Sequence, residues 1–557
     1  MRLSKIVLLL SAVLILNLAT SAQTATTSLH GTVVDPKGGV LPGATVRIVS
    51  PATGFKRDTT SGQDGFYQFL QLPPGTYTVT ADAANVGKVD VKDVRLLVNQ
   101  PTTLDLTVKL AGATTTVEVR GEAPTVNTQD ATIGHAFNTQ QIMSLPFEGR
   151  NAVEILSLQP GVVFTNPTSG TQVNNGFDSR NGSVNGGRSD QTNVTIDGVD
   201  NNDVNDQNGP FQGALRSTLD SIQEFRVTTT NANADVGRSS GAQVVLVTKS
   251  GTDNYHGTLY ESNRSDIGEA NEWFNKNSQV TSGFPNRPPK LIRNVFGGSI
   301  GGPIVKDRFF WFFTYEGERR AESLQVTRVV PSDDLRNGII HYFDTSGNVQ
   351  TLTPAQIATM DTCTTTCPWG PGVNPNALAV LQTYPHPNTD AVGDTLNFRG
   401  FTFSASTPER TNTLIGKLDL NVDQAGNHKI FVRGNLQDDH AVSENVSGSG
   451  SFSDQQQFPG RPANATSIDN SRGIAIGYTA ILGQNLINNV RYGFIRQGYG
   501  RSGIGDQNRV TFRGLDDPVG FRRSSFVNVP SNNITDDVVW TKGKHTFQFG
   551  GNLRIIL

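Results

Sequence analysis

The sequence predicts a mainly β protein in three parts: a small N-terminal β-sandwich, a compact αβ module, and the first part of a large antiparallel transmembrane β-barrel. Three observations support this. Short segments of alternating polar and apolar residues, separated by Pro and Gly turns, fill the first hundred residues. Longer alternating segments fill the second half, and the connections between them alternate between short and long. The N-terminus has the pattern of an export signal, and no later stretch has the ~18 apolar residues of a membrane helix.

The length and composition of the chain limit the classes of function that it can have. A chain of 557 residues should hold several domains. The formal net charge is only −3, which gives no reason to expect nucleic acid as a partner. Two cysteines are too few for a disulfide framework or a multi-cysteine metal site.

Residues 1–22 are predicted to be a secretory signal peptide. Arg2 and Lys5 precede an apolar run over Ile6–Leu18, and Thr20-Ser21-Ala22 supplies small residues for cleavage. The mature protein is therefore expected to be exported. If it enters a membrane, it must do so as a β-barrel.

Residues 23–111 are predicted to form the β-sandwich. The expected strands are His30–Val34, Ala44–Val49, Gly65–Phe69, Thr76–Ala81 and Thr102–Leu110. The motifs Leu41-Pro42-Gly43-Ala44 and Leu72-Pro73-Pro74-Gly75 lie between them. This pattern resembles the carboxypeptidase regulatory-like domain, which implies an immunoglobulin-like, carbohydrate-binding-like fold. We expect a rigid periplasmic spacer in preference to a ligand-binding module.

Residues 112–124 are a short extended segment before the αβ module. Thr116, Val117, Glu118 and Val119 alternate as a strand does. They resemble the TonB box, the segment that pairs with an energising protein by strand addition. An ordinary linking strand is an equal alternative.

Residues 125–250 hold the most specific pattern. A turn at Gly186-Gly187-Arg188 leads into a strand, Thr192–Ile196, which stops at the turn dipeptide Asp197-Gly198. A more continuously apolar strand follows at Ala242–Thr248, and short helices are expected at Gln140–Leu145 and Ala152–Leu158. With Ile196-Asp197-Gly198, this module resembles the plug of TonB-dependent outer-membrane receptors, in their Oar-like branch.

Residues 251–557 are predicted to be the barrel. Lipid-facing strands alternate, as where Leu418 and Leu420 lie opposite Lys417 and Asp419. The run Phe309–Phe313 is expected to place aromatics at a membrane interface. The expected strands are Tyr255–Arg264, Leu291–Gly302, Phe309–Glu318, Arg410–Val422, Lys429–Asp438, Arg472–Leu482, Leu486–Tyr499, Thr535–Thr541 and His545–Arg554.

Short periplasmic turns and long external loops are typical of outer-membrane barrels. The connections at 303–308, 423–428, 483–485 and 542–544 are short, and those between them are long and polar. About nine strands are expected where plugged transporters have ~22. We therefore expect an incomplete barrel, from the N-terminal part of a longer protein.

Other motifs give weaker signals. Gly237–Gly241 matches Gly-x-Ser-x-Gly, but a strand follows it where a nucleophile elbow needs a helix. The acidic stretch Asp197–Gly209 is expected to be a solvated turn, with a calcium site as the alternative. Cys363 and Cys367 are a candidate disulfide in the longest external loop. No catalytic residue, metal site or cofactor is expected.

The resemblance implies a receptor or transporter in the outer membrane of a Gram-negative bacterium, with its N-terminal domains in the periplasm. It would bind an extracellular ligand, a carbohydrate or a peptide among others, and import it by plug rearrangement. A TonB-type energy-transducing complex and outer-membrane lipid are the implied partners. The alternative is a non-transporting surface protein for adhesion or protein sorting.

Overall fold

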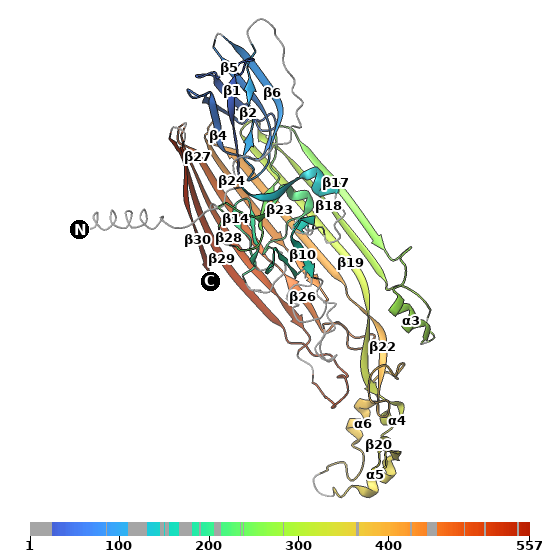
Figure 1. Cartoon of the computed structure of the whole chain (residues 1–557). Helices are drawn as coiled ribbons and strands as arrows, with labels where there is room; N and C mark the ends of the chain where they lie inside the picture. Colours follow the sequence, from blue (N-terminus) through green and yellow to red (C-terminus); the bar gives the residue numbers. More distant parts are fainter. Residues whose placement is uncertain are drawn as a thin grey trace, which may run out of the picture.

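A computed structural model of the chain shows three β-rich parts (Figure 1). It describes residues 25–84, 86–109, 131–144, 150, 155–156, 158–165, 181–188, 191–204, 213–233, 236–237, 239–281, 283, 285–363, 367–423, 426–442, 454–483, 485–505, 508–542 and 545–557. The expected signal peptide and the TonB-box-like residues Thr116–Val119 lie outside these ranges.

The N-terminal part is a sandwich of two sheets. One sheet holds β1 (Thr27–Val34), β4 (Phe66–Leu72), β7 (Thr102–Thr103) and β8 (Leu106–Thr107). The other has the order β3-β2-β5-β6, with β3 (Lys56–Thr60), β2 (Thr45–Val49), β5 (Gly75–Ala83) and β6 (Gly87–Leu96). Alternate residues of both sheets point inward and form one apolar core that includes Leu29, Ile48, Tyr67, Phe69 and Val79.

Two sandwich features differ from the sequence prediction. The expected strand Thr102–Leu110 is interrupted and forms two short strands, β7 and β8. Both pair in parallel with β1. Strands β3 and β6 were not predicted. Strand β3 is polar throughout, so it lacks the alternation of polar and apolar residues that indicates a strand.

The middle part is a five-stranded sheet, here called the central sheet. Its order is β14-β13-β16-β15-β9. All six residues of β16 are buried, as expected for a continuously apolar strand. The strands are β9 (Ile133–Asn138), β13 (Asn193–Ile196), β14 (Val199–Asp200), β15 (Ile222–Thr230) and β16 (Gln243–Thr248).

Smaller elements flank the central sheet. A three-stranded sheet comprises β10 (Val162–Thr165), β11 (Asn181–Val184) and β12 (Gly187–Arg188). The first expected helix is present as α2 (Thr139–Ser144), and η3 (Leu219–Ser221) is a single 3₁₀ turn. The second expected helix, Ala152–Leu158, is wrong in type where it is described, because residues 155, 156 and 158 have 3₁₀ geometry.

Nine long antiparallel strands form a curved sheet, here called the strand wall. Each pairs with the next one along the wall in the order β17-β18-β19-β23-β24-β27-β28-β29-β30. All nine expected strands are present: β17 (His256–Ser265), β18 (Leu291–Val305), β19 (Phe309–Pro331), β23 (Glu409–Asn421), β24 (His428–Gln437), β27 (Arg472–Ile481), β28 (Leu486–Gly503), β29 (Ser525–Lys542) and β30 (His545–Ile556).

The two faces of the wall differ in exposure. Leu418, Val490 and Tyr492 are exposed on the outer face, while their neighbours Lys417 and Arg491 are buried on the inner face. The aromatic run on β19 obeys the same alternation. Phe310 and Phe312 are buried and Phe313 is exposed. None of the helices in the described part of the chain has the length and apolarity needed to cross a membrane.

The two ends of the wall also differ. The sandwich lies at the end with the short turns, and α4, α5 and α6 lie at the opposite end (Figure 1). That opposite end was not predicted in detail. It carries α3 (Trp273–Thr281), α4 (Asp333–Arg336), β20 (Ile340–Phe343), β21 (Val349–Leu352), α5 (Pro354–Met360), α6 (Pro375–Leu381), β22 (Phe398–Ser406), β25 (Asp439–Ala441) and β26 (Ala465–Asp469).

Candidate functional site between the central sheet and the strand wall

The hairpin of β13 and β14 brings the central sheet to the wall. Ile196 pairs with Val199, so Asp197 and Gly198 are the two residues of the turn. Their φ angles are +51° and +76°, as a tight turn with two left-handed residues requires. A Cβ on Gly198 would lie 2.9 Å from Nε of Arg491 on β28. The turn therefore needs glycine for its backbone angle and for its approach to the wall.

Asp197 is the centre of a buried charge cluster. Its Oδ1 lies 3.4 Å from Nζ of Lys417 on β23, and its Oδ2 lies 3.0 Å from Nε of Arg433 on β24. The Arg433 contact is an ion pair in which Nε makes no hydrogen bond. Thr248 adds a backbone N–H at 3.0 Å and a hydroxyl at 2.7 Å. Burial by itself would raise the pKa of Asp197, but Lys417, Arg433 and Thr248 hold that pKa below its usual value.

This cluster corrects the expectation of a solvated turn beginning at Asp197. The side chain is 4% exposed, and its charge is balanced by protein cations. The described residues contain no group of three or more His, Cys, Asp or Glu side chains arranged to hold a metal ion.

A second set of contacts follows the hairpin along the wall. Asp200 Oδ2 lies 3.1 Å from an Nη atom of Arg554 on β30. The backbone N–H of Asp200 donates to Asn533 on β29. Arg554 also donates to the carbonyl oxygen of Asn202. The hairpin is thus attached to β23, β24, β29 and β30 through polar groups.

The segment before η3 makes a third attachment. Arg216 lies 3.8 Å from Asp439, its N–H donates to Gln437, and its carbonyl accepts from Asn435. The apolar part of this attachment is small, since the buried cluster here consists of Ala214, Leu215 and Ile495. The larger apolar core belongs to the central sheet and its flanking elements.

Two acidic groups complete the interface on the side of β17 to β19. Asp220 pairs with Lys249 at 2.8 Å and accepts from the Thr258 hydroxyl at 2.6 Å. Burial opposes ionisation of Asp220, but Lys249 and the hydroxyl donors hold its pKa below the usual value. Glu316 accepts from Arg150 at 3.1 Å and from Tyr260 at 2.6 Å.

The predicted plug motif is divided between two sheets. Ile196, Asp197 and Gly198 lie at the wall. Gly186, with φ of +84°, forms the turn between β11 and β12, and Gly187 and Arg188 are β12 itself. One half of the motif therefore contacts the strand wall, and the other half belongs to the three-stranded sheet. At the opposite end of the wall, Cys363 and Cys367 form a disulfide.

The wall residues of this site were not identified from the sequence. Lys417, Arg433 and Arg491 lie at inward positions of strands whose outer positions are apolar. The signal in the sequence that could have identified these residues is a charged residue at an inward position of an alternating strand. Its partner could not be read, because Asp197 lies 220 residues before Lys417.

Comparisons with known proteins agree with this architecture. Residues 247–556 match the family described as "Outer membrane beta barrel domain", and residues 28–109 match the "Carboxypeptidase regulatory-like domain". The chain is 24% identical over 336 residues to the TonB-dependent transporter Oar of Myxococcus xanthus, across 55% of this chain and 29% of that protein. It therefore spans less than a third of this curated relative.

Solved structures that resemble part of the chain include a transporter and a receptor. The outer membrane transporter YddB from Escherichia coli has a TM-score of 0.48 and 13% identity, over 76% of this chain and 48% of that one. The siderophore receptor PirA from Acinetobacter baumannii has a TM-score of 0.42 and 10% identity, over 76% of this chain and 47% of that one.

Proposed function

The chain belongs to the outer membrane beta barrel domain family, and from this premise we propose that it is a TonB-dependent receptor that imports an extracellular ligand. Its location is the outer membrane of a Gram-negative bacterium. In this proposal the central sheet is the plug and the strand wall is part of the barrel. The residues involved bind and move, and none of them is catalytic.

The observation that carries the proposal is the bridge from Asp197 to Lys417 and Arg433. A plug that must leave its place needs contacts that can be exchanged for water. Polar groups keep their hydrogen bonds when hydrated, whereas a large apolar interface would have to be exposed. The attachment between sheet and wall is made of ion pairs and hydrogen bonds, and this supports a movable plug.

We further propose that a TonB-type complex pulls on Thr116–Val119. A short alternating segment ahead of the plug suits strand addition to an energising protein. A force applied there would reach the central sheet through the chain itself. We propose that the imported ligand is a carbohydrate or a peptide.

Energy-dependent exposure of Ala214 tests this proposal. Ala214 is buried between the plug and Ile495 of β28, so an Ala214→Cys thiol should react with an impermeant maleimide only when the plug moves. In energised cells in rich medium, we expect labelling that a protonophore reduces several-fold. Deleting residues 114–119 should reduce it equally. Ser346→Cys, on an exposed external turn, is the control and should label regardless of energy.

Surface display is the second candidate function, and one observation favours it. The outer end of the wall carries a folded unit with its own apolar core of Val330, Leu381, Tyr384, Phe458 and Leu515. An ordered external unit suits adhesion or protein sorting. Labelling of Ala214→Cys that is unaffected by energy, together with lost cell contact after removal of residues 332–397, would favour display over transport.

A further inference from the structure

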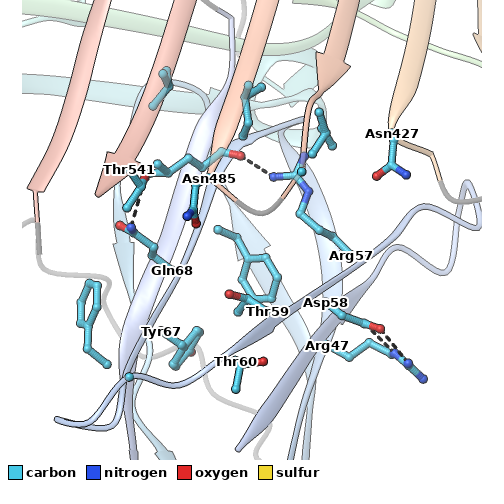
Figure 2. Close-up of a pocket in the computed structure, with 18 of the residues that line it drawn as sticks. Arg47, Arg57, Asp58, Thr59, Thr60, Tyr67, Gln68, Asn427, Asn485 and Thr541 are labelled. Atoms are coloured by element: carbon cyan, nitrogen blue, oxygen red, sulfur yellow. Dashed lines mark hydrogen bonds and ion pairs between the residues drawn. The ribbon is translucent and has the colours of Figure 1, made fainter. Parts of the chain in front are cut away.

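A cavity of about 910 Å³ lies between the sandwich and the short-turn end of the strand wall (Figure 2). On the sandwich side it is lined by β3 and β4, and each of these strands is at the edge of its sheet. On the wall side it is lined by turn residues Asn427 and Asn485 and by the ends of β27, β28 and β29. Its volume is within the range of small-molecule sites.

The wall side of the cavity belongs to the inner face. Ile481, Ile487 and Val539 are paired across three neighbouring strands and form one apolar row in the lining. Ile487 is an even number of residues from Arg491 on β28, as Val539 is from Asp537 on β29, so each pair points to the same face. Arg491 and Asp537 are buried on the inner face. The cavity is therefore continuous with the inside of the wall's curve. Because outer-membrane barrels have short turns on the periplasmic side, this is the periplasmic mouth.

Arg57 is a charged group of this cavity that has spare hydrogen-bond donors. Its Nη1 donates to the carbonyl oxygen of Leu70 at 2.5 Å, while its buried Nε has no hydrogen-bond partner among the described residues. Its guanidinium carbon lies 5.5 Å from the centre of the Phe55 ring. Burial lowers the pKa of the Arg57 guanidinium to about 10, and no carboxylate acts on it in compensation.

The other charged groups around the cavity have interaction partners of their own. Arg47 and Asp58 form a two-bond pair at 2.7 and 2.8 Å, visible in Figure 2. Asp64 accepts from the backbone N–H of Phe66. Lys429 lies 3.5 Å from the centre of the same Phe55 ring, outside the lining. It is repelled by Arg57 and attracted by Asp419 and Asp423. Lys56 is the remaining cation of the lining, and it interacts electrostatically with Asp58 and Asp307. Among the described cations of the lining, Arg57 is therefore the one on which no carboxylate acts.

We propose that this cavity binds a water-soluble organic anion, with a carboxylate or phosphate group on Arg57 and its carbon skeleton against Ile481, Ile487 and Val539. A guanidinium with free donors in a partly desolvated site is suited to an oxyanion. The amides of Asn427 and Asn485 and the Thr541 hydroxyl, shown in Figure 2, supply further polar contacts. A lining on the inner face of the wall favours a soluble anion over a lipid headgroup. Equilibrium binding of the anion in this cavity does not depend on transport by the chain.

Calorimetric titration of the full chain in a neutral detergent tests the proposal. The probes are citrate for the carboxylate and glycerol 3-phosphate for the phosphate, with glycerol as the neutral control. We expect at least one anion to bind, and Arg57→Gln to weaken that binding at least about tenfold. Arg47→Gln is the matched control in the same lining, and it should change the affinity less than about twofold because Arg47 is engaged with Asp58.

A second measurement uses the unmodified protein, in case Arg57→Gln does not fold. Phenylglyoxal modifies arginines, and mass spectrometry locates the modified residues. The bound anion should slow modification of Arg57 several-fold and leave Arg47 unaffected. Failure of both anions to bind the wild-type chain, or equal protection of Arg47 and Arg57, would overturn the proposal.

Discussion

Val199 of β14 and Gly493 of β28 are in direct contact across the boundary between the central sheet and the strand wall. A Cβ on Gly493 would lie 3.2 Å from the Cβ of Val199 and 2.0 Å from one of its methyl groups. No side chain fits at position 493 while valine occupies position 199. This contact therefore sets the closest approach of the central sheet to the wall at this point.

This contact predicts a disulfide tether. In the double variant Val199→Cys/Gly493→Cys the valine methyl groups are absent, and the two Cβ atoms are a few tenths of an ångström closer than disulfides prefer. We expect a bond to form in isolated outer membranes. Both added thiols should resist a maleimide after denaturation and react once reduced. The single variants are the controls. Thiols that react fully without reduction would show that the contact is not made in the membrane.

The charge cluster predicts an unequal effect of two Asp→Asn changes. Asp197→Asn leaves Arg433 buried without its counter-charge and leaves Lys417 with its interaction with Asp419 alone. Breaking a buried ion pair typically costs about 3–5 kcal/mol. Asp58→Asn removes an exposed partner of Arg47 and should cost less than about 1 kcal/mol. Limited proteolysis in detergent should cleave residues 191–248 much faster in Asp197→Asn. Equal cleavage of the two variants would contradict the role given to the cluster.

The two turn glycines predict a second matched comparison. Gly186 and Gly198 have φ of +84° and +76°, so alanine at either position costs about 1–2 kcal/mol in backbone energy. Only Gly198 has Arg491 in the path of a new Cβ, whereas the space around Gly186 is open. Gly198→Ala should therefore lower the melting temperature more than Gly186→Ala. Equal effects at the two positions would show that Arg491 moves aside without cost.

Glu224 predicts a pH dependence of the attachment between the sandwich and the central sheet. Its carboxylate accepts from the backbone N–H of Val98 at 2.9 Å. Burial raises the pKa of Glu224 from 4.5 to about 7, although Val98, Arg95 and Arg226 act in the opposite direction. Because the native pKa is the higher one, the stabilising contribution is complete below pH ~4.5 and is lost as pH rises through about 7.

Glu224→Gln should remove this dependence, because glutamine keeps an acceptor for Val98 without a charge. Between pH 5 and pH 8, the wild type should lose on the order of 3 kcal/mol relative to the variant. Melting temperatures of both proteins at the two pH values measure the difference. If the two proteins differed in melting temperature by the same amount at both pH values, a group other than Glu224 would be responsible for the pH dependence.

The existence and order of all nine strands of the wall could be predicted from the sequence, but β19 continues to Pro331 and β29 begins at Ser525, well outside their predicted bounds. Strands such as β23 and β28 alternate over most of their length, because one face meets lipid and the other meets polar groups. The Asp197-Gly198 turn could also be predicted, since few dipeptides adopt two left-handed angles. The alternation and the turn could both be predicted because each depends only on residues that are consecutive in the sequence.

The remainder depends on contacts between distant residues. Strand β3 is polar and becomes a strand by pairing with β2, which its own composition does not indicate. Asp197 was expected to meet solvent, because Lys417 and Arg433 approach it only when the chain folds back. Arg57 was not identified for the same reason, since its cavity exists only where β3 and β4 meet the ends of β27 to β29.

The position of the sandwich restricts where the chain can change in length. Asp307, Asn427 and Asn485 lie in the short turns, against the sandwich or its cavity. An epitope tag inserted into one of these turns would push the two parts away from each other. The connections at the opposite end have no such neighbour in the described structure, so a tag within residues 266–290 should be tolerated. Variation in loop length among relatives should follow the same rule and concentrate on the side that faces the environment.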